Sequence, residues 1–109
     1  MLDTRAIFAD IQREWIIPAD LPYFDGHFPG QPVFPAVGIV DASLALVRRI
    51  SERVDLQLLG VISAKFTAVL GPGTRVVIQT ERVRDDEWQL DWSDGGATKY
   101  ASLRLKVSP

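Results

Sequence analysis

Cysteine is absent from this chain of 109 residues, and histidine occurs once, as His27. The lack of cysteine excludes disulfide bonds, thiolate nucleophiles and zinc sites built on thiolates. A chain without cysteine is compatible with a reducing compartment, and we expect a cytoplasmic protein. The sequence also lacks a phosphate-binding glycine loop, a dinucleotide-binding fingerprint and a cluster of metal-ligating residues.

The sequence also lacks a basic excess and a long apolar segment. The net charge is -2 and the isoelectric point is about 5.2, which argues against a general nucleic-acid binder. The first fifteen residues have acidic side chains and no apolar core of a secretory signal. The longest apolar run, "FPGQPVFPAVGIV", is broken by proline and is too short to cross a bilayer, so no membrane association is expected.

What the chain does contain is enough apolar material for one small core. Hydrophobic residues make up 47% of the sequence, and no repeat or linker divides it, so residues 1–109 are expected to form one domain. Because a domain of this size buries a limited area by itself, a partner subunit would add stability.

Hydrophobic periodicity predicts one helix and several strands. The helix is expected over residues 36–54, after an irregular loop over 19–35. Its expected apolar stripe is Val37, Val40, Leu44, Val47 and Val54, with a second stripe of Ile39, Leu46 and Ile50. The expected strands are residues 11–17, 56–70, 74–84, 87–93 and 101–107.

Two of these strands alternate cleanly between apolar and polar residues. Trp88, Leu90 and Trp92 share one face, where core packing or an interface is favoured over a platform for stacking bases. The apolar face of the last strand is Ala101, Leu103, Leu105 and Val107. An antiparallel meander curved round one buried helix is the economical arrangement, which gives an α+β fold.

His27 lies in the stretch "YFDGHFPGQPVFPAV", which contains three of the seven prolines. Proline and glycine exclude a regular helix here and hold the backbone in a fixed loop. A lone histidine on a loop can be without a task. A rigidly placed imidazole that titrates near neutral pH, however, is also suited to general-base catalysis.

Asp41 is the second candidate, because apolar helix neighbours surround it in sequence. A carboxylate in such a setting is costly unless it is paired or neutralised. Two structural explanations stay open beside a catalytic one. Asp41 can bond a local backbone group, or it can be stabilised by the N-terminal dipole of the helix.

The stretch "GHFPGQPVFPAVGIVDA" resembles the motif of the β-hydroxyacyl-acyl carrier protein dehydratases, which have the hotdog fold. That motif is His-Phe-Pro-Gly, a proline, a Pro-Gly-Val, and then a carboxylate on the helix. His27 matches the motif histidine, and Asp41 matches the carboxylate fourteen positions later. The downstream stretch "LGVISAKFTAVLGPGTRVVIQ" is also similar to the family, so the resemblance extends roughly over residues 11–107.

This resemblance implies a hotdog fold and the removal of water from a 3-hydroxyacyl thioester. His27 is then the base and Asp41, from the partner subunit of a homodimer, is the acid. The amide of Ala36 is the oxyanion donor, although the family has glycine at that position. Further substrate-binding residues implied by the match are Phe28, Val33, Phe34 and Gly38.

The resemblance also implies the partners. The acyl chain is expected to arrive on an acyl carrier protein or on coenzyme A, and neither a metal nor an organic cofactor is expected. The assembly is expected to be a homodimer or a higher oligomer of dimers. Two alternatives stay open: a hotdog thioester hydrolase centred on Asp41, and a non-catalytic subunit that binds acyl carrier protein.

Overall fold

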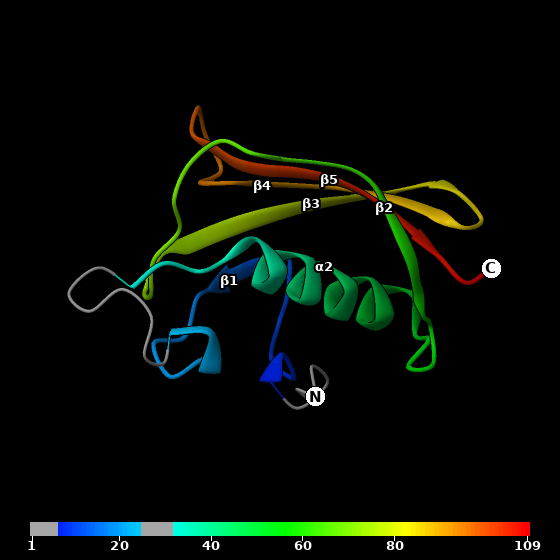
Figure 1. Cartoon of the computed structure of the whole chain (residues 1–109), viewed down its shortest axis with the longest axis horizontal. Helices are drawn as coiled ribbons and strands as arrows, with labels where there is room; N and C mark the ends of the chain where they lie inside the picture. The colour runs from blue at the N-terminus through cyan, green and yellow to red at the C-terminus, as the bar shows by residue number, and fades with distance from the viewer. Residues whose placement is uncertain (1–6, 25–31) are drawn as a thin grey trace.

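The computed structural model describes residues 7–24 and 32–109. The elements are, in chain order, β1 (Glu14–Ile16), the 3-10 turn η1 (Pro22–Phe24), helix α2 (Ala36–Ser51), β2 (Leu58–Phe66), β3 (Arg75–Arg84), β4 (Glu87–Ser93) and β5 (Lys99–Val107). The strands form one five-stranded sheet in the order β1-β3-β4-β5-β2, and every neighbouring pair is antiparallel (Figure 1).

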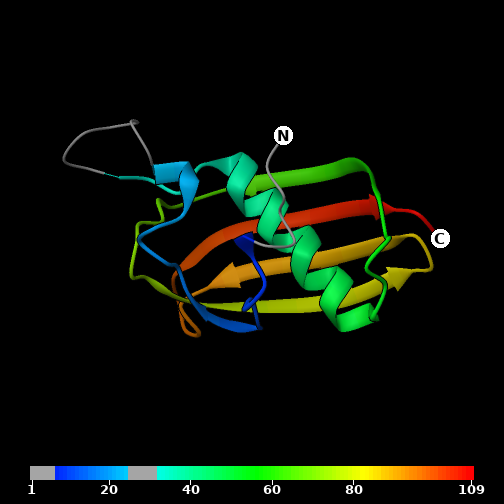
Figure 2. The ribbon, with the colours of Figure 1, turned by 90° about the horizontal axis from the view of Figure 1, so that it is seen from below.

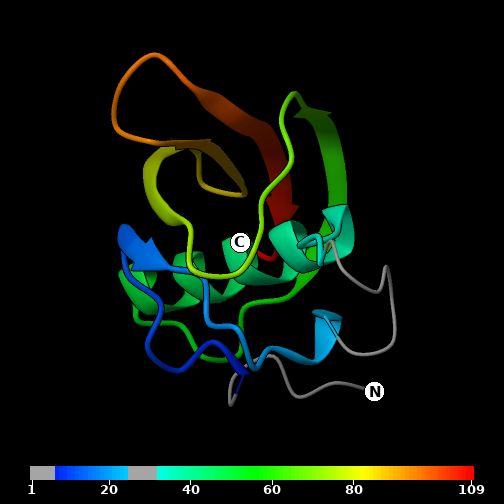
Figure 3. The same cartoon turned by 90° about the vertical axis from the view of Figure 1, so that its left-hand side faces the viewer.

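The sheet curves over helix α2, which lies along its concave face. Figure 2 shows the helix running obliquely across the strands, and Figure 3 shows the sheet arching from β1 and β3 on one side to β2 on the other. The α+β prediction and the hotdog arrangement of one helix inside an antiparallel sheet are therefore confirmed. No helix in the described ranges is long and apolar enough to cross a membrane.

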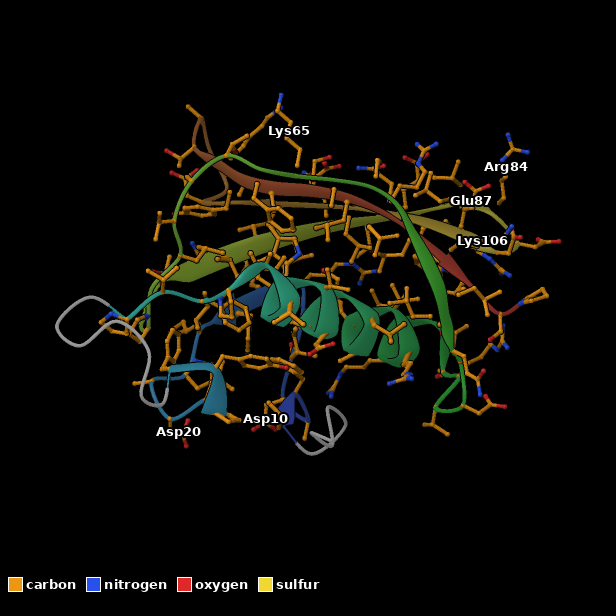
Figure 4. All side chains as sticks on the ribbon, viewed as in Figure 1. Asp10, Asp20, Lys65, Arg84, Glu87 and Lys106 are labelled. Atoms are coloured by element: carbon orange, nitrogen blue, oxygen red, sulfur yellow. The ribbon has the colours of Figure 1, made fainter. Side chains whose placement is uncertain are left out.

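The core lies between the helix and the sheet, as the alternation of β4 and β5 predicted. Trp88, Leu90 and Trp92 are all buried, which confirms that this face of β4 belongs to the core. On β5 the buried residues are Ala101, Leu103, Leu105 and Val107, as expected. Charged side chains keep to the periphery: Figure 4 shows Lys65 pointing away from the helix, and Arg84, Glu87 and Lys106 near the far end of the sheet.

The helix is shorter than the periodicity predicted. It ends at Ser51, because Glu52 adopts the left-handed conformation with φ of 57° and its amide donates back to the last turn. Val54 therefore lies beyond the helix and is 69% exposed, and Val37 at the other end is 60% exposed. The predicted stripe was wrong at these two positions, because Val54 lies outside the helix and Val37, in the first turn, is not covered by the core.

The predicted meander was also wrong for its first strand. β3, β4 and β5 follow one another as hairpins. β2 does not pair with β3, its neighbour in the chain, but with β5, and it forms an edge of the sheet. Residues 67–74 thus cross the end of the sheet instead of forming a hairpin. Backbone bonds hold this crossing: Phe34 donates to Leu70 at 2.7 Å, and Gly73 donates to Ile17 at 2.7 Å.

Sequence periodicity overestimated the length of two strands for a related reason. β1 is limited to Glu14–Ile16, and β2 to Leu58–Phe66. The flanking apolar residues Ile11, Ile17, Leu56 and Leu70 are fully buried, but they lie in connections and pack into the core from there. Apolar side chains beside a strand therefore extended the pattern past the point where ladder pairing stops.

One buried hydrogen bond fastens the helix to the sheet. The indole Nε1 of Trp92 donates to the hydroxyl of Ser43 at 3.0 Å, and both side chains are fully buried. Ser43 is the one buried polar residue of the described core. Because a buried indole N–H without a partner is costly, this bond fixes the rotation of α2 under β4.

We expect Ser43→Ala to lower the free energy of unfolding by about 1 to 3 kcal/mol, because it leaves the Trp92 N–H without its acceptor. Urea unfolding followed by tryptophan fluorescence measures this change. Thr98→Ala is the control, since Thr98 is exposed in the connection between β4 and β5 and loss of its hydroxyl is expected to change stability little. Equal stability of the two variants would contradict the assignment.

Candidate active site

The sequence-predicted site residues divide into two groups. His27 and Phe28 lie outside the described residues. Val33, Phe34, Ala36, Gly38 and Asp41 are described, and they lie on the segment that enters α2 and on its first two turns.

The chain enters the helix through Pro35, which has extended backbone angles of φ -75° and ψ 164°. Its carbonyl accepts the amide of Ile39 at 3.1 Å, so the first intrahelical bond begins there. No side chain of the described residues caps this end. Ala36 is the first helical residue and is exposed, and a first-turn amide has no acceptor within the helix. An amide in this position can donate to a developing negative charge.

Phe34 forms the centre of an aromatic cluster directly below the helix entry. Its ring is 2% exposed and contacts the rings of five other aromatic residues. These are Phe8, Trp15, Tyr23, Phe24 and Trp92. Phe34 is thus a core residue of the chain, and Val33 beside it is half-buried.

Gly38 lies against the Phe34 ring. A Cβ atom at Gly38 would come within 2.5 Å of ring atom Cε1 of Phe34, closer than real Cβ contacts allow. Because glycine has no side chain, the helix packs closely against the Phe34 ring at Gly38. The motif position that sequence reasoning assigned to substrate binding also has this packing requirement.

Asp41 lies one turn further along α2 and is half-buried. The hydroxyl of Tyr23 donates a hydrogen bond to Oδ2 of Asp41 at 2.6 Å. This distance falls in the range of charge-assisted O–H···O⁻ bonds. The carboxylate thus has a side-chain partner, which answers the question of how a carboxylate tolerates its apolar helix neighbours.

Tyr23 itself is buried, with 8% of its side chain exposed. Burial raises the pKa of the Tyr23 phenol above its ordinary value, and the hydrogen bond and the negative charge of Asp41 raise it further. A phenol already ionises only in alkaline solution, so Tyr23 stays protonated and stays the donor at neutral pH.

Sequence reasoning did not assign a role to Tyr23. The available signal was the cost of a carboxylate among apolar residues, which requires a nearby donor. A tyrosine suits this task because its ring packs with apolar residues while its hydroxyl reaches a polar atom. The sequence alone did not show that residue 23 meets residue 41 in the fold.

Within residues 7–24 and 32–109, no three histidine, cysteine, aspartate or glutamate side chains gather closely enough to hold a metal ion. At this candidate site, the chemistry that the described residues offer is that of the Asp41 carboxylate, the Tyr23 phenol and the first-turn amides of the helix.

A curved antiparallel sheet around a central helix, with a carboxylate on that helix, defines the class of the protein as a hotdog-fold protein. The family model ApeI-like, described as ApeI dehydratase, matches residues 5–104. The chain therefore belongs to the ApeI-like dehydratase family, which confirms the resemblance seen in the sequence.

The curated relatives that this chain matches are also named as dehydratases. The 3-hydroxyacyl-acyl-carrier-protein dehydratase FabZ of Myxococcus xanthus is 39% identical over 71 residues, which are 58% of this chain and 46% of the relative. FabZ of Chloroflexus aggregans is 36% identical over 81 residues, which are 65% of this chain and 55% of the relative. The chain spans about half the length of the curated relatives it matches.

Solved structures support the fold. The dehydratase heterocomplex ApeI:P from Xenorhabdus doucetiae matches with a TM-score of 0.73 at 18% identity, over 88% of this chain and 84% of that chain. A mutant form of FlK, a fluoroacetyl-CoA-specific thioesterase, matches with a TM-score of 0.58 at 18% identity, over 87% and 80%. Hotdog proteins of two activities thus share this architecture.

We expect Gly38→Ala to destabilise the protein by about 1 to 3 kcal/mol, because the new methyl group overlaps a ring that five others hold in place. The better helix propensity of alanine offsets part of this cost. Chemical denaturation measures the change. Gly60→Ala is the control, since a Cβ there meets no atom within 4 Å. A Gly38→Ala protein as stable as this control would show that the Phe34 ring can move aside.

Proposed function

We propose that the protein removes water from a 3-hydroxyacyl thioester to give the 2-enoyl thioester. The observation that carries this proposal is Asp41, a half-buried carboxylate held on the central helix of a chain in a dehydratase family. FabZ relatives are named as dehydratases of acyl-carrier-protein substrates, which supports a carrier-bound thioester, or its coenzyme A counterpart, as the substrate here.

The reaction divides between three groups. His27 takes the proton from the carbon next to the thioester carbonyl, and the electron pair of that C–H bond forms the enolate. The amide of Ala36, at the helix start, donates to the enolate oxygen. The new C=C bond then forms as the C–O bond to the 3-hydroxyl breaks, and Asp41, protonated for this step, supplies the proton that makes the leaving group water. The proton taken up by His27 returns to Asp41 afterwards, which restores both groups for the next turnover.

The proposed acyl-chain contacts are Phe28 and Val33. Gly38 and Phe34 pack against each other and support the segment that enters α2. The ring of Phe34 is buried in the core, so its proposed role is indirect. It fixes the entry of α2 and thereby the position of the Ala36 amide. No metal or organic cofactor takes part in this proposal, since proton transfer and oxyanion stabilisation account for each step.

We expect His27→Ala and Asp41→Asn each to lower the rate of dehydration by at least about 100-fold, the usual scale of one acid or base group. The assay follows formation of the enoyl thioester from a 3-hydroxyacyl thioester on acyl carrier protein and on coenzyme A. Two controls accompany them. Asp55→Asn removes an exposed carboxylate and leaves the rate unchanged, and Ala36→Gly keeps the amide and retains activity.

Three results would oppose this function. Full activity in both the His27 and Asp41 variants removes the site assignment. Release of free thiol that needs Asp41 but not His27 indicates a thioester hydrolase. Binding of acyl carrier protein without turnover at any chain length indicates a non-catalytic subunit.

The same proposal includes a homodimer, in which His27 of one subunit acts with Asp41 of the other. Strand β2 supports it, because β2 is an edge of the sheet and pairs with β5 on one side only among the described strands. Its exposed apolar side chains are Leu59, Val61, Ile62 and Phe66. An apolar edge of this length is prone to pair with another strand, and two copies of β2 related by a two-fold axis satisfy each other's edge.

We expect the wild type to be a dimer and Val61→Asp to shift it to a monomer, because the charge enters the proposed contact between the two edges. Sedimentation equilibrium across a concentration series measures the shift. Val54→Asp is the matched control, because Val54 is 69% exposed in the connection between α2 and β2 and is not one of the β2 residues that form the proposed contact. A dimer that resists Val61→Asp but dissociates with Val54→Asp would place the interface elsewhere.

A further inference from the structure

Tyr23 contacts Asp41 through a bond whose donor is more buried than its acceptor. The phenol is 8% exposed and its oxygen lies 2.6 Å from Oδ2 of the carboxylate, while Asp41 is half-buried. The acceptor therefore keeps a side open to an incoming molecule. The donor is enclosed, and its ring packs in the aromatic cluster.

The position of the Tyr23 hydroxyl is fixed by three sets of contacts. The ring stacks on Phe8 at a centroid distance of 6.0 Å with 20° between the planes, and meets the edge of Phe34 at 5.5 Å and 81°. The backbone is held in η1, where the amide of Phe24 donates to the carbonyl of Leu21 at 3.0 Å. Because these contacts confine the ring and the backbone, the hydroxyl of Tyr23 donates its hydrogen bond in one direction, toward Asp41.

The contact also selects between the two carboxylate oxygens. Tyr23 occupies Oδ2, so Oδ1 is the oxygen that the phenol leaves for another partner. An aspartate side chain has two torsions, and a short bond to one oxygen limits the rotation that would exchange the two. Catalysis by a positioned acid depends on this kind of orientation.

We propose that Tyr23 is the positioning residue of the active site: it holds Oδ2 of Asp41 so that Oδ1 meets the 3-hydroxyl of the substrate. This role rests on the proposed function, since it requires Asp41 to act on the leaving group. Tyr23 does not touch the reacting atoms. It acts through Asp41, and the buried aromatic cluster around Phe34 supplies its rigidity.

The test is Tyr23→Phe, which removes the hydroxyl and keeps every ring contact. We expect kcat for dehydration to fall about tenfold, the worth of one hydrogen bond to a charged group, with little change in KM. The matched control is Tyr100→Phe, which removes the hydroxyl of the chain's other tyrosine, a half-buried residue on β5. That control is expected to keep wild-type kcat. Thermal unfolding confirms that each variant is folded.

A double-mutant cycle separates positioning from a structural role. If Tyr23 acts through Asp41, Tyr23→Phe has no further effect on the residual rate of Asp41→Asn. The same fold loss in both backgrounds, or a wild-type kcat in Tyr23→Phe, overturns the proposal while Asp41 remains the acid. Wild-type activity of Asp41→Asn overturns both, and it identifies the proposed function as the part that fails.

Discussion

The close approach of the Phe34 ring to Gly38 is the contact on which the site depends. The ring occupies the space that any side chain at position 38 would need. It therefore sets the packing distance between α2 and the aromatic cluster. This distance in turn sets the positions of Ala36, which precedes Gly38 on the helix, and of Asp41, which follows it. The same ring meets the edge of Tyr23, so one packing contact positions both the carboxylate and its hydrogen-bond donor.

The core around this contact is aromatic and yet anchored by polar bonds at two points. Ser43 accepts from Trp92 inside the core, and Asp41 accepts from Tyr23 at its margin. Both acceptors are on α2, two residues apart, and their donors come from strand β4 and from the turn η1. These two bonds orient the helix between the sheet and the loop, which apolar packing alone does with less specificity.

Much of the fold followed from the sequence because its signals were local. Strict alternation identified the buried faces of β4 and β5, and the run from Ala36 identified the helix start. The pairing of β2 with β5 was missed, because strand order depends on how residues 67–74 cross the sheet, and their bonds to Phe34 and Ile17 are between residues distant in sequence. The helix end was missed because a glutamate, not a glycine, adopts the left-handed turn at position 52.

The site shows the same division between local pattern and long-range contact. Spacing along the chain was enough to connect Asp41 with a family motif, since the motif is contiguous. The partner of Asp41 is Tyr23 in η1, eighteen residues earlier, and only the fold brings the two side chains within 2.6 Å. A carboxylate on an apolar helix needs such a partner, because its charge would otherwise be costly and its rotation free. The aromatic cluster therefore does more than fill the core: by burying the ring of Tyr23, it holds the hydroxyl of this packing residue in place as a donor to the carboxylate.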